Sequence, residues 1–462
     1  MLTIGFVLFA SSYALAQNTC PAAVPNDGVD DAPALQNCLN GGGNIALPFG
    51  VYTLAAHGLT ITQPSTWFHS LGQRAILQAA PSLQAKMLVA VANSFTLSDL
   101  EFDGNRLGRA GNRDFLCNPN NFGGQRPANI DIAASFYTIH HVVSKNALCG
   151  AGMGLRGVGY NVYENIVHDN GWEAGVYPPG VEPWSDGITA LDCQNGTIAN
   201  NLIANNTDLD LVVGGGPNCM VTGNTIIHDT RYGFGGLSIG NFADAGVNRG
   251  NHNGSVFSGN SVSSGLNLLS IGILIGAHPW DTNPIYDVSN AGLVTNNSSS
   301  GSVINMLLEG FASGAVYGNT IGASQGTRGM TCTVSAPIAG WHFPWSSVQG
   351  PVVGLENDLA TSGNPCVPQG VVSPQISISS PPHGATFPAG STITVTSSAS
   401  DPDGTVTRVD YYANGGYVGS AFAAPWSLSA PNVAAGTYVV HSVAIDNHGL
   451  SSRSRPHTIF VQ

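Results

Sequence analysis

Three aspartates lie close together in a chain that has few charged residues. Asp186 stands in the segment 184–188, and Asp208 and Asp210 stand two residues apart. Residues i and i+2 of one strand share a face about 6.5–7 Å apart, so we expect Asp208 and Asp210 to form a carboxylate pair. Carboxyl groups at such a separation suit acid–base cleavage of a glycosidic bond. The pattern predicts catalysis by this pair, with Asp186 close by.

Histidines and cations nearby offer a second chemistry. His168 and His228 each precede an aspartate at matching positions of two repeats, and Lys145 fills that place in a neighbouring repeat. Arg156 and Arg231 are candidate cations for a uronate carboxylate. A base beside a uronate could abstract the proton that β-elimination requires. These residues therefore suit a lyase or an epimerase, and a purely structural histidine stack is the alternative.

Aromatic residues gather near the first aspartate. Trp172 and Trp184 stand with Glu173 in the segment 171–184. Aromatic side chains commonly line ligand sites, so we predict that these three residues contact substrate. The rings could equally cover the fold beneath them.

Composition and charge exclude several classes of protein. Only 9% of the 462 residues are charged, 43% are hydrophobic, and 59 are glycine, which favours a long β architecture over a helical one. The net charge of −13 argues against nucleic acid as a partner. After the N-terminus, no apolar run approaches the roughly 18 residues of a membrane span. We expect a monomer that acts on an extracellular polysaccharide.

The N-terminus and the cysteines indicate export. Residues 1–16 form an apolar stretch that ends in Ala-Leu-Ala, which is typical of a cleaved signal peptide. The eight cysteines all follow it, and their even number favours disulfides, with Cys20–Cys38 and Cys332–Cys366 as plausible local pairs. We therefore expect a secreted or extracellular protein, with the periplasm or the cell surface as alternatives.

A sequence repeat with a constant period runs through the middle of the chain. Its anchor positions differ in sequence number by 23, 37, 23, 36, 36 and 23; they are His141, Glu164, Asn201, Asn224, Asn260, Asn296 and Asn319. Such a period with asparagine at one turn is typical of the coils of a parallel β-helix, where amide side chains stack along the axis. The longer intervals predict inserted loops near 171–184, 242–254 and 277–290, gathered on one face.

The repeat also bears on the direction of the first aspartate. One period places Asp186 beside Leu209, between Asp208 and Asp210. If Ile188 points inward, strict alternation sends Asp186 inward too. A bulge or turn at Asp186 must therefore reorient it, or else it is a structural residue.

The region after the leader resembles the opening of the pectate-lyase-like β-helix superfamily. Residues 26–36 form an acidic turn that leads into a short helix, and residues 41–52 form a glycine-rich link, a strand and a Pro-x-Gly-x-Tyr turn. The resemblance implies an all-β, right-handed parallel β-helix (a solenoid) over residues 17–370 with a short N-terminal capping helix. Asp31 can cap that helix, and Pro33 suits its first turn.

Within that superfamily, the aspartates resemble the site of polygalacturonase-type glycosidases. Ser185-Asp186-Gly187 is similar to the Asn-Thr-Asp-Gly segment of that family, and Asp208-Leu209-Asp210 is similar to its Asp-Asp pair about one coil later. The glycine-rich segment 233–240 lacks the histidine of that family, and the chain has no Arg-x-Lys. The resemblance implies sugar hydrolysis and leaves the substrate open.

Residues 371–462 change character and indicate a second domain. Alternating segments at 375–379 and 392–396 are separated by Asp-, Asn- and Gly-rich turns, which favours a small β-sandwich. The region is similar to bacterial immunoglobulin-like modules appended to secreted polysaccharide-degrading enzymes. Asp401, Asp403 and Asp446 could hold calcium, although ordinary turns are favoured.

The leading hypothesis is a secreted enzyme that cleaves the glycosidic bonds of a polysaccharide by carboxylate-driven hydrolysis. A polysaccharide lyase or epimerase with a His, Lys and Arg site is the alternative enzyme, and a non-catalytic β-helix adhesin or surface carbohydrate binder is the alternative class. We expect no required cofactor and no catalytic metal. A calcium ion could bind at a site built from Asp99, Asp103 and Glu173.

Overall fold

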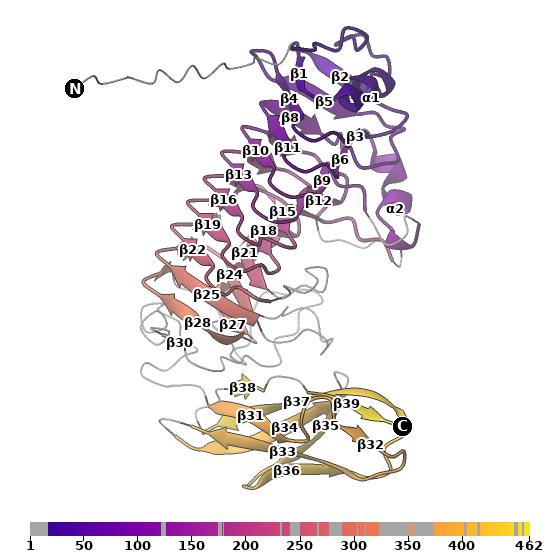
Figure 1. The fold of residues 1–462 in the computed structure, drawn as a ribbon. Helices are drawn as coiled ribbons and strands as arrows, with labels where there is room; N and C mark the ends of the chain where they lie inside the picture. The colour runs from indigo at the N-terminus through magenta and orange to yellow at the C-terminus, as the bar shows by residue number, and fades with distance from the viewer. Residues whose placement is uncertain are drawn as a thin grey trace, which may run out of the picture.

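The fold is a parallel β-helix followed by a β-sandwich (Figure 1). The computed structural model describes residues 17–121, 126–173, 178, 180–231, 233–240, 250–265, 268–276, 289–302, 304–309, 311–322, 352–353, 374–401, 404–413, 416–447, 451–454 and 457–462. Within the described part of residues 17–353, strands form three parallel sheets, which we call sheets A, B and C. Each coil contributes one strand to each sheet in turn.

The strands of the three sheets follow one another in chain order. Sheet A holds β1 (Asn44–Leu47), β4 (Trp67–Ser70), β7 (Thr96–Ser98), β10 (Thr138–His140), β13 (Asn161–Tyr163), β16 (Thr197–Ala199), β19 (Met220–Thr222), β22 (Val256–Ser258), β25 (Ser289–Thr295), β28 (Phe311–Tyr317) and β30 (Val352–Val353). Sheet B holds β2 (Val51–Leu54), β5 (Ala75–Ala79), β8 (Leu100–Asp103), β11 (Val143–Lys145), β14 (Ile166–His168), β17 (Leu202–Ala204), β20 (Thr225–His228), β23 (Ser261–Ser264), β26 (Ser298–Ser300) and β29 (Thr320–Ile321). Sheet C holds β3 (Leu59–Ile61), β6 (Leu88–Ala90), β9 (Ile130–Ala133), β12 (Gly150–Arg156), β15 (Ser185–Ala190), β18 (Leu209–Val213), β21 (Gly233–Gly240), β24 (Leu269–Gly276) and β27 (Ile304–Glu309).

Apolar side chains at equivalent positions stack into the core of the solenoid. In sheet A, Ile139 pairs with Val162, Val162 with Ile198, and Ile198 with Val221. All four side chains are fully buried. Their sequence numbers differ by 23, 36 and 23, whereas the corresponding anchors of the sequence repeat differ by 23, 37 and 23. Figure 1 shows β10, β13, β16, β19 and β22 following one another along one side of the stack.

A ladder of buried asparagines follows the turn between sheets A and B. Each side-chain Nδ2 donates to the Oδ1 of the next asparagine at 2.9 Å; the members are Asn165, Asn201, Asn224, Asn260, Asn297 and Asn319. The predicted stacking is confirmed, but three anchors are shifted by one residue. Asn165 and Asn297 stand in the ladder in place of Glu164 and Asn296, and Val142, which follows His141, donates its amide to Asn165. Glu164 and Asn296 instead adopt φ of 55°, a turn conformation that asparagine tolerates well.

The inserted segments leave the coils at two different corners. The segment between β14 and β15 joins sheet B to sheet C, whereas those after β21 and after β24 join sheet C to sheet A. Most residues of these loops lie outside the described residues, so the expectation that the loops gather on one face stays a prediction. A further insertion between β8 and β9 carries η1 (Ala110–Asn112), α2 (Arg113–Leu116) and η2 (Pro119–Asn121) and lies at the same corner as the first. It precedes the first anchor, which is why the repeat did not indicate it.

A helix covers the N-terminal coil, as the resemblance implied. In α1 (Ala32–Gly41), Leu35 and Leu39 are fully buried, and α1 packs against β3. Asp31 precedes α1 but does not cap it with its side chain. Its carboxylate instead accepts hydrogen bonds from the amides of Val24 and Thr53, both at 2.9 Å, so it fastens the cap to β2.

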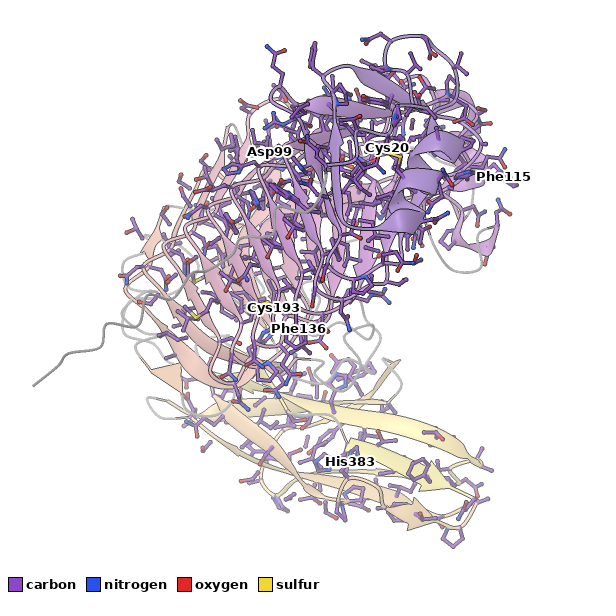
Figure 2. The ribbon with its side chains drawn as sticks, turned by 45° about the horizontal axis from the view of Figure 1, so that its top comes forward. Cys20, Asp99, Phe115, Phe136, Cys193 and His383 are labelled. Carbon is purple, nitrogen blue, oxygen red and sulfur yellow. A yellow bond between two sulfur atoms is a disulfide. The ribbon has the colours of Figure 1, made fainter. Side chains whose placement is uncertain are left out.

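Three disulfides lie within the described part of the solenoid. Cys20–Cys38 joins the N-terminal segment to α1, as predicted, and Figure 2 labels Cys20 beside that helix. Cys117–Cys149 and Cys193–Cys219 were not predicted as pairs. Cys332 and Cys366, like residues 1–16, lie outside the described residues. Among the described residues, no helix is long and apolar enough to cross a membrane.

The C-terminal region forms two antiparallel-rich sheets. One holds β31 (Gln375–Ser380), β33 (Ile393–Ser400) and β36 (Trp426–Ala430). The other holds β32 (Thr386–Phe387), β34 (Val406–Ala413), β35 (Gly416–Ala421), β37 (Gly436–Asp446), β38 (Ser451–Arg453) and β39 (His457–Val461). Ile376 and Val409 from opposite sheets share one buried cluster, against which Trp426 packs, so this region is the predicted β-sandwich.

The asparagine ladder predicts a large cost for a single truncation. Asn224→Ala removes the acceptor of the Asn201 amide and the donor to the Ile198 carbonyl, all in the buried interior. An unsatisfied buried polar group costs about 1–3 kcal/mol, so we expect the free energy of unfolding to fall by about 2–4 kcal/mol. Urea denaturation measures this change. The control is Asn161→Ala at an exposed strand position, and an equal loss in both variants would contradict the role of the ladder.

Candidate active site

The Asp186 side chain reaches the outer surface of sheet C because its strand breaks strict alternation. A methyl group on Gly187 would lie 2.7 Å from the core side chain of Ile203, so Gly187 faces the interior. The next residue, Ile188, is also fully buried. Two successive inward positions shift the alternation by one residue, as a bulge does. Asp186 therefore faces outward, on the same side as Thr189. This is the bulge that the sequence repeat predicts if Asp186 is not a core residue.

Asp186 and Asp208 are neighbours across two adjacent strands. The Oδ1 atom of Asp186 accepts a hydrogen bond from the amide of Leu209 at 3.1 Å, and the amide of Asp208 donates to the carbonyl of Ser185 at 3.1 Å. Adjacent strands lie about 4.8 Å apart, so the two carboxyl-bearing residues share one small patch of the outer face. Both side chains are half-buried and accessible.

The two carboxyl groups have unlike surroundings. Burial and the negative charge of Asp186 hold the pKa of Asp208 well above its ordinary value, against the opposing effect of Arg126. Burial also raises the pKa of Asp186, but hydrogen bonds from the Thr189 hydroxyl at 2.6 Å and from the Leu209 amide stabilise its ionised form. Among the described residues, none donates a hydrogen bond to the Asp208 carboxyl group. The surroundings favour a protonated Asp208 beside an ionised Asp186.

A cation and two aromatic rings surround the pair. Arg126, from the insertion between β8 and β9, lies with Nη1 3.5 Å from Oε2 of Glu182, and its charge lowers the pKa of both aspartates. The rings of Trp184 and Phe234 meet edge to face with centroids 6.3 Å apart. The amide of Phe234 donates to the carbonyl of Asp208 at 2.9 Å, so the ring pair flanks that residue.

Arg126 also lines a hollow at the neighbouring coils. The hollow has a volume of about 330 Å³ and is bordered by polar side chains that include Thr60, Gln84 and Lys86. The Lys86 ammonium group is paired with Asp131. The hollow lies at the coils of β3 and β6, and Arg126 is the residue that links it electrostatically to the two aspartates.

Asp210 and His228 lie inside the coil, away from this patch. Both side chains are fully buried, with Nε2 of His228 2.7 Å from Oδ2 of Asp210. Burial opposes the charged form of His228, but Asp210 raises its pKa overall. The predicted carboxylate pair of Asp208 and Asp210 is therefore wrong in its geometry, because the break in alternation sends the second aspartate inward. Asn206 donates to Asp210 at 2.9 Å and completes an interior polar cluster.

His168 and Lys145 lie on sheet B with carboxylate partners. Nδ1 of His168 is 2.7 Å from Oδ2 of Asp169. Nζ of Lys145 is 2.7 Å from Oε1 of Glu101 and 3.8 Å from Oδ2 of Asp103. The structure does not bring these two residues together with His228 in an accessible site, because His228 is enclosed.

The segment between β14 and β15 is held by contacts of Arg231, Glu173 and Trp172. Arg231 Nη2 donates to the carbonyl of Gly171 at 2.7 Å, and its Nε lies 3.7 Å from Oε1 of Glu173. The guanidinium groups of Arg106 and Arg113 lie 5.4 and 5.2 Å from the Trp172 ring centroid. Trp172 is thus occupied by cation–π contacts, while Trp184 alone of the predicted aromatic residues adjoins the carboxylate pair.

The remaining predicted ligands are dispersed. Arg156 is exposed at the end of β12. Of the suggested calcium ligands, Asp103 accompanies Lys145, Glu173 accompanies Arg231, and Asp99 lies at another corner beside His141. Asp403 lies outside the described residues. The sequence did not single out Arg126, Glu182 or Phe234 as neighbours of the aspartates, since only the fold places them there.

Comparison with known protein families recognises the C-terminal region. Residues 374–441 match the bacterial Ig domain family. No curated protein matches the chain. Among solved structures, the chain is similar to fibronectin(III)-like modules of CbhA from Clostridium thermocellum, with 25% identity over 19% of this chain and 45% of that chain at a TM-score of 0.18. The chain thus spans less than half the length of that structure.

Two further similar structures belong to bacteriophage proteins. The Dettilon tailspike protein is 13% identical, over 92% of this chain and 79% of that chain, at a TM-score of 0.39. The pre-mature gene product 12 of bacteriophage phi29 is 13% identical, over 68% of this chain and 50% of that chain, at a TM-score of 0.38.

The enclosed Asp210–His228 pair predicts a strong effect on stability. His228→Ala leaves a buried carboxyl group without its partner, and breaking a buried pair in this way costs about 3–5 kcal/mol. We expect the free energy of unfolding to fall by that amount in chemical denaturation. His57→Ala, at an exposed position, should change it by less than about 0.5 kcal/mol. A mild effect of His228→Ala would show that the pair is dispensable for the fold.

The raised pKa of Asp208 predicts that replacing it with a residue that cannot ionise stabilises the folded protein. The folded state binds the Asp208 proton more tightly than the unfolded state, so this contribution to stability is lost as the pH rises through the raised pKa. Asparagine does not titrate. Asp208→Asn should therefore raise the melting temperature at pH 7, and the gain should shrink towards the acidic range. The control is Asp192→Asn, two residues after the end of β15. The Asp192 carboxylate accepts a hydrogen bond from the Gln194 amide, so this variant should not raise the melting temperature at pH 7.

Proposed function

We propose that the chain is a secreted glycoside hydrolase that acts on a polysaccharide, with Asp208 as the general acid and Asp186 as the ionised carboxylate. The observation that carries this proposal is the pair of neighbouring, half-buried aspartates whose surroundings differ. Two titratable groups whose environments push their pKa values apart mark an acid and a base. The three disulfides are typical of an oxidising compartment and support secretion.

The proposed reaction balances with these two groups and water. Asp208 gives its proton to the glycosidic oxygen, and the bond from that oxygen to the anomeric carbon breaks. Asp186 either attacks that carbon, after which water releases the sugar, or removes a proton from the water that attacks. Asp208 regains a proton from the incoming water in the first route, or from solvent in the second. Arg126 stabilises negative charge on the pair between these steps.

The surroundings of the pair supply plausible contacts for a sugar chain. Trp184 and Phe234 offer partly exposed ring surface next to Asp208, and the hollow beside Arg126 offers polar groups that can bind hydroxyls. A solenoid presents such features along an extended surface, which suits a polymer better than a small molecule.

Elimination has weaker support than hydrolysis. A lyase requires an accessible base and a cation that faces the uronate carboxylate. His228 is enclosed, Lys145 is paired with Glu101, and Arg231 holds the carbonyl of Gly171. Arg126, by contrast, lowers the pKa of both aspartates.

A panel of neutral and uronic polysaccharides tests the proposed function. Reducing ends that appear without absorbance from unsaturated uronates support hydrolysis, and the two together indicate elimination. Binding without either product indicates a carbohydrate-binding adhesin and would refute the proposal.

Substitution of the pair should separate the two roles. On a natural polysaccharide, Asp208→Asn and Asp186→Asn should each lower kcat by at least about 100-fold. With an aryl glycoside, whose leaving group needs no proton, Asp208→Asn should recover activity and Asp186→Asn should not. The control Asp192→Asn should keep full activity. Equal loss in both variants on both substrates would contradict the assignment of an acid.

The pH dependence should be bell-shaped. Activity should fall on the alkaline side as Asp208 loses its proton, and on the acidic side as Asp186 gains one. In Asp208→Asn assayed with the aryl glycoside, the alkaline fall should vanish and the acidic fall should remain. Initial rates across the pH range measure both limbs, and an unchanged alkaline limb in that variant would assign the acid to another group.

A further inference from the structure

A second cluster of chemically active side chains lies at the corner between sheets A and B, on a different part of the coil from the aspartate pair. Asp99 stands between β7 and β8; in the next coil, His140 ends β10 and His141 follows it. Asp99 and His141 share the turn conformation, with φ of 56° and 54°, and therefore stack at equivalent positions. Figure 2 labels Asp99 on the N-terminal part of the stack.

The donor atoms of these residues converge. Nδ1 of His140 lies 2.8 Å from Nδ1 of His141, which lies 3.9 Å from Oδ1 of Asp99. All three residues offer a ligand atom within 4.8 Å of the others. The two imidazole nitrogens share one proton at most, and the separation from Asp99 is too long for a hydrogen bond. One shared proton can link the two imidazole nitrogens, but no hydrogen bond joins the Asp99 carboxylate to them, although its oxygen lies close enough to bind the same ion.

Neighbouring side chains hold the two rings in place. Nε2 of His141 lies 2.9 Å from Oε2 of Glu164, one coil further on. A carboxylate on the far nitrogen of a histidine fixes its tautomer and leaves the near nitrogen free to bind a metal ion. The His140 ring stacks on Tyr163 with centroids 5.2 Å apart and planes 6° from parallel. Both imidazoles are thus oriented before any ion binds.

We propose that Asp99, His140 and His141 bind a divalent transition-metal ion, with zinc, nickel and copper as the fitting class. Imidazole nitrogen with one carboxylate oxygen is a donor set that suits these ions. In a tetrahedral zinc site with bonds of about 2.05 Å, two nitrogens stand about 3.3 Å apart, so a small rotation of either ring from the observed 2.8 Å completes the geometry. The exposed side of His141 leaves a coordination position for water.

The ion would join two successive coils and act on stability rather than on catalysis. Its ligands come from the corner between sheets A and B, whereas Asp186 and Asp208 lie on the outer face of sheet C. A ligand that binds only the folded state raises the melting temperature to a degree set by its concentration and affinity. Metal binding should therefore raise the melting temperature without changing the action of the aspartate pair.

Asparagine is the suitable replacement at these turns. Asn200 and Asn296 occupy the equivalent turns of other coils with φ of 56° and 55°, so His141→Asn and Asp99→Asn keep the backbone conformation. The asparagine side chain removes the imidazole or the charged carboxylate that the ion requires. A folded variant is therefore expected in both cases, and its melting temperature without metal should stay near that of the wild type.

The test is calorimetric titration of the full, tag-free chain with zinc chloride after treatment with a chelator. We expect one zinc ion per chain in the wild type and in the control His57→Asn, which removes an exposed histidine elsewhere. His141→Asn and Asp99→Asn should lose that binding. Glu164→Gln should weaken it by about tenfold, as for other partners of ligating histidines.

Thermal unfolding with and without zinc gives the second measurement. Zinc should raise the melting temperature of the wild type and of His57→Asn and leave that of His141→Asn unchanged. If His141→Asn binds zinc with the same affinity and stoichiometry as the wild type, or if the wild type shows no saturable binding, the proposal is wrong. The failure of this test would leave the hydrolase proposal untouched, because the two sites share no residue.

Discussion

The stacking of one coil on the next governs the rest of the structure. Each coil must bury backbone groups at its corners where no strand can satisfy them, and the ladder from Asn165 to Asn319 does this with side-chain amides. Each amide accepts from the backbone of one coil and donates to the next, so the coils are held in a fixed register. That register then decides which residues of adjacent strands become neighbours, including Asp186 and Asp208.

The aspartate patch depends on a local exception to this regularity. Regular alternation would have placed Asp186 in the core and Asp208 with Asp210 on one side. The inward pair Gly187–Ile188 shifts the first strand by one residue, so Asp186 faces outward, and the buried Asp210 shows a matching inward position on β18. Glycine at 187 allows this because a side chain there would collide with Ile203 and with the carbonyl of Asp210. An outward-facing carboxylate, Asp186, and a buried one, Asp210, thus follow from the same local break in alternation.

The sequence predicted the fold well and the site only in part, for a physical reason. The period of the repeat and the capping segment are local or repetitive signals, and they led to the solenoid, the capping helix and the sandwich. Asp186 and Asp208 were also found, since their separation of about one period implies contact across strands. Arg126 and Phe234 could not be assigned to them, because the insertion between β8 and β9 has no period and its path depends on tertiary packing. The wrong pairing of Asp208 with Asp210 came from applying strict alternation to a strand that breaks it.

The ion-pair partners of the carboxylates across the described residues give a separate argument for the proposed role of Asp208. Most carboxylates of the solenoid have a cationic or histidine partner: Asp131 pairs with Lys86, Glu101 with Lys145, Asp169 with His168, and Asp210 with His228. In a chain with so few charges, such pairing is what stability alone would select. Asp208 departs from this pattern, because it is half-buried beside another carboxylate and shares only the attraction of Arg126. Surroundings that disfavour the ionised form of Asp208 lower the stability of the folded protein at neutral pH. Such destabilising arrangements are found mainly where the chemistry of a site requires them.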